Sequence, residues 1–240
     1  WLEGHSIVSR YICEVPEKYT ASFFVNTDLE NNQIASFYTG AMADAGKLSL
    51  FDVDPGEIDY VVISPNDPGA MRKYTEECIR LGIPYLFDPS QQVARNPHED
   101  LRMGVESAHA VFSNEYEWDL LMKHTGLSLK QIDSHVKLMV ITRGQNGATV
   151  KSDDKEYTIP IVPADTIADP TGVGDAFRGG FLRGYRLGLD LQTCGQMGAL
   201  SATYCLEQKG PTNHAYTPIE YIERYRKHFD DGGALDILIK

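Results

Sequence analysis

The sequence is short of basic residues and of cysteine. Its 22 lysines and arginines face 34 aspartates and glutamates, which gives a net charge of −12 over 240 residues. Binding of nucleic acid without sequence preference needs clustered basic side chains, so the acidic balance argues against a nucleic-acid partner. The four cysteines form no C-x-x-C pair and no zinc-like cluster with histidine, which indicates a reducing, cytoplasmic compartment. No apolar run approaches the roughly 20 residues that cross a bilayer, so we expect no membrane partner.

What is present is typical of a globular chain. Hydrophobic residues make up 42% of the sequence and charged residues 23%, as in domains that bury a sizeable core. The chain opens with Trp1-Leu2-Glu3-Gly4, which has the pattern of a helix end stopped by glycine. Because a fold rarely begins at the end of a helix, we expect that residues precede this start in the native protein.

The first third of the chain has the pattern of short strands. Residues 20–26 are rich in aromatic and β-branched residues, and residues 34–39 alternate apolar and polar side chains. A polar turn separates the two segments, so they are predicted to form a β-hairpin. Residues 11–13 are predicted to form one further short strand.

From residue 58 onward, apolar runs alternate with helical patterns, which is typical of βαβ units and a parallel sheet. The expected strands are 58–63, 84–87, 109–112 and 136–142, followed by an edge hairpin of 148–150 and 157–161, and a last strand at 235–239. The expected helices are 67–81, 99–105, 115–124, 174–187, 191–207 and 218–228.

The most informative stretch runs from Asp169 to Leu182, DPTGVGDAFRGGFL. Gly172 and Gly174 flank one residue just before a predicted helix, and glycine lets successive backbone N–H groups point the same way. With the positive end of the helix dipole they make an anion hole, and Asp175 in the first turn faces the same spot. Amides that stabilise a moving phosphoryl group, beside a carboxylate that accepts a proton, suit phosphoryl transfer. The alternative is an ordinary helix start, with glycine for the turn and aspartate for the dipole.

The complete stretch resembles the second signature of the ribokinase-like (PfkB-type) carbohydrate kinases, in which an acid, small residues, glycine and aspartate precede a helix of small residues. This resemblance implies an α/β fold of three layers, α/β/α, with a mostly parallel sheet and a small β lid. Residues 1–240 would form one kinase domain that lacks the family's N-terminal segment, with lid strands within residues 7–39. Lid strands often pair between subunits, and whether this chain forms such a homodimer is left open.

The resemblance also implies a mechanism for the glycine turn. The N–H groups of Gly172, Val173 and Gly174 would stabilise the γ-phosphoryl group of ATP during its transfer. Asp175 would accept the proton of the attacking hydroxyl. The acceptor would be the hydroxymethyl group of a small molecule, either a nucleoside or a sugar.

Two further segments resemble metal sites of the family. Asn114 and Glu117 match its N-x-x-E motif, which would organise Mg²⁺ and its water shell, although the pattern also fits a plain helix N-cap. Asp169 and Thr171 match the loop that would hold a monovalent cation such as K⁺.

The nucleotide side of the resemblance lies in the loop after the 136–142 strand and in one late helix. The loop residues would approach the ATP phosphates, while two small helix residues would form the wall beside the adenine. A plain strand-to-hairpin loop and ordinary helix packing are the alternatives. The residues concerned are Thr142, Arg143, Gly144, Gly147, Gly198 and Ala199.

Residues 88–92 (DPSQQ) and the Phe177-Arg178 step look most like bacterial adenosine kinase-like members, so an adenosine kinase-like activity is expected. One alternative is a sugar or sugar-phosphate kinase of the same fold. Arg10 and Lys18 are the only basic residues of the first 39, which favours an uncharged acceptor. The other alternative is a module that binds a nucleotide or nucleoside without catalysis, because the family's N-terminal Asp and Gly-Gly pair, which grip the acceptor, have no counterpart here.

Overall fold

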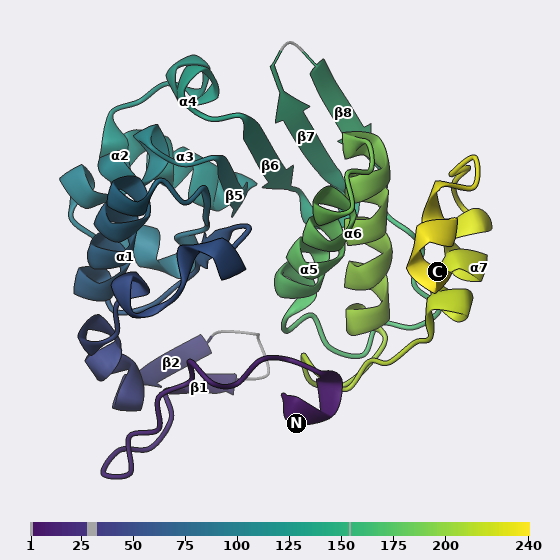
Figure 1. Ribbon diagram of the computed structural model, residues 1–240. Coiled ribbons are helices and arrows are strands. Elements are labelled where there is room, and N and C mark those ends of the chain that lie inside the picture. Colours follow the sequence, from purple (N-terminus) through teal and green to yellow (C-terminus); the bar gives the residue numbers. More distant parts are fainter. Residues whose placement is uncertain (1, 28–32, 154) are drawn as a thin grey trace.

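A six-stranded sheet separates two layers of helices, and a small second sheet lies apart from it, as Figure 1 shows for the computed structural model of the chain. The structure describes residues 2–27, 33–153 and 155–240. The three layers and the small antiparallel sheet agree with the architecture that the sequence predicts.

The strands of the large sheet are neighbours in chain order, from β3 to β8. The first four are parallel, whereas β7 and β8 turn back antiparallel at one edge. The predicted parallel sheet and edge hairpin are therefore confirmed. The strands are β3 (Val61–Ile63), β4 (Tyr85–Phe87), β5 (Ala110–Asn114), β6 (Leu138–Thr142), β7 (Ala148–Ser152) and β8 (Lys155–Ile159).

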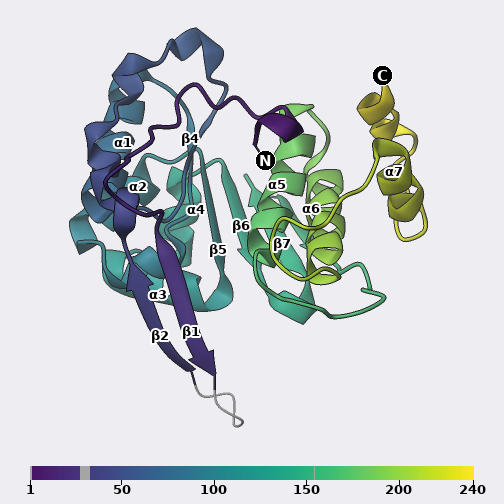
Figure 2. The ribbon, with the colours of Figure 1, turned by 90° about the horizontal axis from the view of Figure 1, so that it is seen from below.

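Helices cover both faces of this sheet. The first four lie on one face, and α5 and α6 lie on the other with α7 packed against α6 (Figure 1 and Figure 2). None of the described helices is both long enough and apolar enough to pass through a membrane. The helices are α1 (Pro68–Leu81), α2 (His98–Glu106), α3 (Glu115–Thr125), α4 (Leu129–His135), α5 (Val173–Arg186), α6 (Leu191–Leu206) and α7 (Pro218–Arg226). Short 3-10 helices are η1 (Glu3–His5), η2 (Gly40–Lys47), η3 (Leu50–Asp52), η4 (Pro55–Glu57), η5 (Ser90–Ala94), η6 (Gly144–Asn146) and η7 (Ala234–Ile239).

Alternation along the central strands explains how the sheet is buried on both faces. On β5, Ala110 and Phe112 belong to the core under α5 and α6, while Val111 between them belongs to the core under α1 to α4. β6 alternates in the same way, with Val140 on one side and Met139 on the other. Successive strand residues point to opposite faces of the sheet. Strands that are apolar throughout therefore fit a sheet with helices packed on both faces.

Helix boundaries follow capping residues that can be read in the sequence. α1 begins after Asp67, whose carboxylate accepts a hydrogen bond from the backbone N–H of Ala70 at 3.1 Å. The helix ends at Gly82, which adopts the left-handed conformation with φ +67. The predicted helix 67–81 therefore agrees closely with the observed α1.

The small sheet consists of β1 (Ser22–Thr27) and β2 (Gln33–Tyr38), paired antiparallel with Phe23 opposite Phe37. The predicted hairpin strands are thereby confirmed, while residues 28–32 of the predicted turn lie outside the described residues. Phe23 and Phe24 are 65% and 60% exposed. In both views the small sheet lies outside the large sheet and its helices (Figure 1 and Figure 2). Its role as a lid stays a prediction.

Two predicted strands are wrong, and one helix was not predicted. Residues 235–239 lie in the 3-10 helix η7, where Leu235 is buried and Ile237 is exposed. An apolar run becomes a strand only where a sheet edge accepts it, and this run packs against α7 instead. Residues 11–13 form no strand and are exposed. The short α4 escaped prediction because a single buried residue, Ile132, anchors it.

We predict that Phe181→Ala lowers the free energy of unfolding by about 3–5 kcal/mol, because it leaves a cavity in a rigid part of the core. Phe181 on α5 is fully buried and packs edge-on against Phe112 with ring centroids 5.4 Å apart. The exposed Phe23 is the matched control, and Phe23→Ala should cost less than about 1 kcal/mol. Denaturant unfolding followed by circular dichroism measures both, and equal losses would contradict this picture of the core.

Candidate active site

Three parallel strands end in polar residues at one edge of the large sheet. Asp88 follows β4, Ser113 and Asn114 end β5, and Thr142 ends β6. Asn114 and Thr142 are direct partners in the register of β5 and β6. Because the carboxyl ends of parallel strands meet at the same edge, these four residues line one cavity, of about 210 Å³.

The start of α5 forms another wall of this cavity. Gly172 has φ +82, and a Cβ atom at this position would lie 2.4 Å from the Cβ of Pro211, so the turn requires glycine. As the N-cap, Gly172 gives α5 no side-chain cap, which α2 also lacks, whereas α1, α3, α4, α6 and α7 each have one. The next N–H, that of Val173, makes only a long hydrogen bond of 3.4 Å to the carbonyl of Pro170. This uncapped start, at the positive end of the helix dipole, suits an anion.

Asp175 lies in the first turn of α5 and borders the same cavity, as does Gly174. Its side chain is 77% exposed, and its Oδ1 accepts a hydrogen bond from Nη2 of Arg178 at 2.7 Å. Nη1 of Arg178 lies 2.6 Å from Oδ2 of Asp88. One guanidinium group thus joins two carboxylates that come from different elements of the fold.

Asp88 is buried beneath this arrangement. Burial raises the pKa of its carboxyl group to about 7, although the guanidinium of Arg178 favours the charged form. The other oxygen, Oδ1, and the buried hydroxyl of Ser113 have no hydrogen-bond partner within the described part of the chain. Buried polar atoms are normally satisfied, so a polar ligand or ordered water in the cavity is their natural partner.

Asn114 and Glu117 form a reciprocal capping box at the start of α3. Asn114 Oδ1 accepts the backbone N–H of Glu117 at 2.9 Å, and Glu117 Oε2 accepts the backbone N–H of Asn114 at 3.0 Å. Glu117 Oε1 accepts the hydroxyl of Ser90 at 3.0 Å. Among the described residues, no three His, Cys, Asp or Glu side chains converge as a metal site. The oxygens that line the cavity fit Mg²⁺ held through its waters, because this ion takes oxygen ligands and keeps much of its hydration shell.

The predicted nucleotide loop makes a tight turn after β6. Thr142 lines the cavity, whereas Arg143 turns to Oε1 of Glu115, at 2.8 Å from its Nε. Gly144 and Gly147 both have positive φ, and a Cβ atom on Gly147 would lie 2.0 Å from the carbonyl oxygen of residue 159. The glycines therefore serve the turn itself, and the predicted contact with ATP phosphates stays a prediction.

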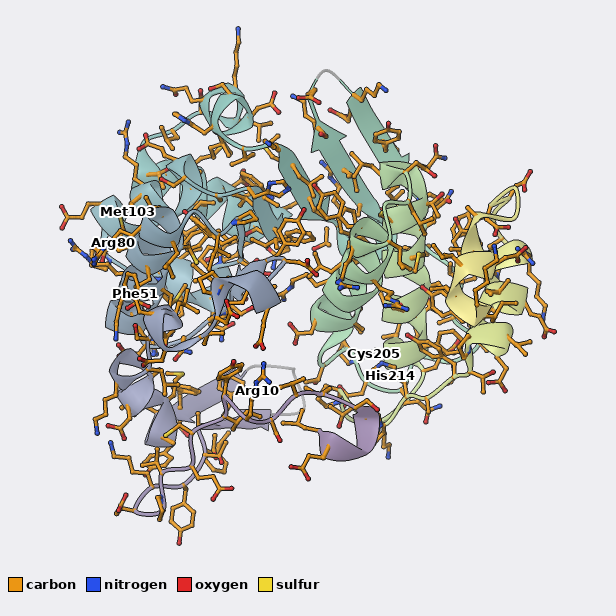
Figure 3. The ribbon with its side chains drawn as sticks, viewed as in Figure 1. Arg10, Phe51, Arg80, Met103, Cys205 and His214 are labelled. Atoms are coloured by element: carbon orange, nitrogen blue, oxygen red, sulfur yellow. The ribbon has the colours of Figure 1, made fainter. Side chains whose placement is uncertain are left out.

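Asp169 ties two loops together beside the start of α5. Its Oδ1 accepts the backbone N–H of Thr171 at 2.9 Å, and its Oδ2 accepts that of Gly210 at 3.0 Å. Hydrogen bonding to the Thr171 side chain, together with these two backbone N–H groups, lowers the pKa of Asp169. The sulfur of Cys205 lies 3.5 Å from the carbonyl of Thr171, at the end of α6 where Figure 3 also shows His214. The predicted role of Asp169 and Thr171 as cation ligands stays a prediction.

Gly198 and Ala199 lie in the packed interior on α6. Both are buried, and a Cβ atom on Gly198 would lie 2.8 Å from the carbonyl oxygen of Phe177 on α5. This close approach explains the glycine by helix packing. The wall beside an adenine, which the sequence pattern assigns to these two residues, stays a prediction.

Sequence reasoning gave no site role to Asp88, Ser113 or Arg178. A signal for the first two was present, because each lies at or just after the end of a buried strand, as Asn114 and Thr142 do. Arg178 carried no such signal. Its place at the cavity depends on the distance between α5 and the end of β4, which only the folded structure supplies.

Comparison with known proteins identifies the family. The profile described as pfkB family carbohydrate kinase matches residues 1–218. A nucleoside kinase from Methanocaldococcus jannaschii is 30% identical over 212 residues, which are 88% of this chain and 69% of that protein. Its solved structure, described as an archaeal member of the ribokinase family, has a TM-score of 0.84 and covers 95% of this chain and 75% of that one at 30% identity. The ribokinase-like fold is therefore confirmed.

Other relatives act on nucleosides by name. The nucleoside kinase of Burkholderia thailandensis in complex with inosine has a TM-score of 0.86 at 34% identity, and the match covers 95% of this chain and 76% of that one. The structure of the same protein with ADP-inosine also has a TM-score of 0.86 at 34% identity, and the match covers 95% of this chain and 71% of that one. Adenosine kinase of Saccharomyces cerevisiae is 32% identical over 136 residues, 54% of this chain and 39% of that protein. The profile match over most of the chain, together with the shared fold, shows that this protein is a kinase of the PfkB family.

Proposed function

We propose that this chain is a nucleoside kinase, which transfers the γ-phosphoryl group of ATP to the hydroxymethyl group of a nucleoside. One observation carries the proposal: the exposed carboxylate of Asp175 and the uncapped start of α5 border the same cavity. The similarity to a kinase whose structures contain inosine and ADP-inosine supports the nucleoside as acceptor and the adenine nucleotide as donor. The proposal is broader than the adenosine kinase-like activity expected from the sequence, since adenosine kinase matches a shorter part of the chain.

The backbone of the glycine turn would stabilise the group in transfer. The N–H groups of Gly172, Val173 and Gly174 begin a helix that has no side-chain cap, so they can donate to phosphoryl oxygens. Donors fixed in place before the reaction lower the energy of the charge that develops in the transition state. Apart from its chain neighbours and the backbone of its own helix, a Cβ atom on Gly174 would meet no atom of the described residues within 4 Å, so this face of the turn is open.

Asp175 would act as general base. Its carboxylate accepts the proton of the acceptor's hydroxymethyl group as the hydroxyl oxygen attacks the γ-phosphorus in line. The large exposure of the side chain leaves room for an acceptor beside it. The acceptor oxygen and the anion-binding amides would then lie on two sides of the same phosphorus.

Asn114 and Glu117 would face the metal that accompanies the nucleotide. Both are already fixed by their capping box, so they would hold the water shell of the ion rather than the ion itself. When bound, Mg²⁺ neutralises charge on the β- and γ-phosphates. Asp169 fixes the loop in which Thr171 lies, and we assign K⁺ or a similar ion to the carbonyl groups there.

The remaining nucleotide contacts are assigned to the loop after β6 and to α6. Thr142 borders the cavity and would approach the phosphates directly, with the backbone of the adjoining turn beside it. The two α6 residues would lie beside the adenine. The assigned residues are Thr142, Arg143, Gly144, Gly147, Gly198 and Ala199.

A sugar-phosphate acceptor is less favoured, because the cations near the start of the chain are occupied. Arg10 is bonded to Glu57, and Lys18 lies 2.6 Å from Asp44. A second phosphate on the acceptor would need free cations, since phosphate recognition depends on arginine or lysine. An uncharged nucleoside makes no such demand.

We predict that the protein consumes ATP with inosine, adenosine or cytidine as acceptor and much less with ribose or fructose 6-phosphate. Sites that bury hydrogen-bonding groups against a base discriminate strongly against acceptors that lack it. A coupled assay of ADP formation, with product identified by mass spectrometry, measures this. Preferred turnover of fructose 6-phosphate would make the chain a sugar-phosphate kinase, and binding without ADP formation would make it a binding module.

We predict that Asp175→Asn lowers kcat by about 10²–10⁴-fold, the usual contribution of a general base. The thermal midpoint should change little, because the replaced side chain is mostly exposed. Asp119→Asn, which removes an exposed carboxylate from α3, is the control and should keep full activity. Near-normal turnover by the Asp175 variant would remove the basis of the proposed mechanism.

We predict that Gly174→Ala keeps the fold but lowers kcat at least about tenfold, because its methyl group projects toward the phosphoryl site and displaces it from the amides. Gly179→Ala is a matched control, since that glycine lies on the same helix, is exposed and also has no atom within 4 Å of a built Cβ. Steady-state kinetics and thermal unfolding of both variants test this. If the two variants are equally active, the amides of the turn do not hold the phosphoryl group.

A further inference from the structure

Arg178 joins three separate elements of the fold at the edge of the cavity. Its Nη1 forms an ion pair with Oδ2 of Asp88, which follows β4, at 2.6 Å, and donates to the hydroxyl of Ser64, which follows β3, at 3.2 Å. Its Nη2 donates to Oδ1 of Asp175 on its own helix at 2.7 Å. A single planar group therefore connects the ends of two strands to the first turn of α5.

The two ends of this bridge differ in burial. The side chains of Arg178 and Asp88 are only 15% and 6% exposed, whereas that of Asp175 is 77% exposed. An exposed pair one turn apart on a helix is weak on its own, because both side chains lose conformational freedom to form it. Here Asp88 and Ser64 have already fixed the guanidinium, and its rigid fork presents the second nitrogen to Asp175.

The combined charge of Asp88, Arg178 and Asp175 suits a site that accepts a proton. An arginine paired with Asp175 alone would neutralise the carboxylate. The buried Asp88, whose pKa is raised to about 7, supplies a second negative charge once it is ionised, and the two carboxylates and one guanidinium then carry a net charge of −1. Arg178 can therefore orient Asp175 and still leave the group able to take up one proton.

We infer that Arg178 is a positioning residue for Asp175: anchored by Asp88 and Ser64, it holds Oδ1 and leaves Oδ2 to accept the proton of the acceptor hydroxyl. This inference rests on the proposed function. In the step, the O–H bond of the acceptor breaks and its proton moves to Oδ2. The acceptor oxygen bonds to the γ-phosphorus, and the bond from that phosphorus to the β-phosphate oxygen breaks, which releases ADP.

The test compares variants of the full chain by steady-state kinetics. Arg178→Met alone would leave Asp88 buried without its cation and could cost the fold, so the main variant combines Arg178→Met with Asp88→Asn. Arg178→Lys keeps the charge but lacks the fork that reaches both carboxylates. Arg186→Met is the matched control, since Arg186 lies on the same helix and forms an exposed ion pair with Asp59 at 2.7 Å.

We expect the double variant to lose about 10- to 100-fold in kcat, the effect of a misplaced reacting group, with KM for ATP and for the nucleoside within about threefold. Arg178→Lys should recover part of this loss, and Arg186→Met should match the wild type.

Other outcomes overturn the inference and separate it from the proposed function. If the double variant keeps wild-type kcat and loses only thermal stability, Arg178 is purely structural. If KM for ATP rises at least about tenfold with kcat unchanged, Arg178 binds phosphate instead. Both results leave the nucleoside kinase intact. The variants are compared with whichever acceptor the wild-type protein phosphorylates, since Oδ2 of Asp175 can accept the proton of any hydroxyl. A wild-type protein that phosphorylates no acceptor overturns both proposals.

Discussion

The close contact between α5 and α6 determines where the glycine turn lies. A Cβ atom on Gly180 would lie 2.7 Å from the carbonyl oxygen of Met197, and one on Gly198 would lie 2.8 Å from that of Phe177. Glycine at these positions lets the two backbones approach more closely than side chains would allow. α5 also packs on the sheet, where Phe181 contacts Phe112 on β5, and its first turn lines the same cavity as the ends of the parallel strands. The amides, the exposed carboxylate of Asp175 and the strand-end residues can then share one cavity.

An acidic chain can hold a polyphosphate because the binding groups are local. The net charge of −12 is spread over the molecule, whereas the cavity offers backbone N–H groups at the positive end of a helix. Arg178 adds one cation that is itself balanced by the buried Asp88. The site therefore does not need the clustered lysines that binding to nucleic acid demands, and the exclusion of nucleic acid from composition is compatible with a nucleotide as substrate.

The parts of the fold that depend on local patterns could be predicted from the sequence. The apolar strands, the Asp67 cap and the Gly82 stop placed the sheet and α1, and the motif from Asp169 onward pointed to the cavity. Elements that depend on tertiary context could not be predicted. Residues 235–239 look like a strand but lack a sheet edge to pair with. The bridge made by Arg178 needs the packed distance between α5 and β4, and no spacing in the sequence encodes that distance.

Gly172 and Pro211 are far apart in the sequence but adjacent in the structure, and each limits the conformation of the other's segment. Gly172 has a positive φ, and a Cβ atom built on it would overlap the ring of Pro211. Position 172 therefore tolerates no side chain as long as the loop at 210–213 has its present conformation. A change at one position must be accompanied by movement of the other segment. A side chain in place of Gly172 would thus require a different path for a loop that lies nearly forty residues later in the chain.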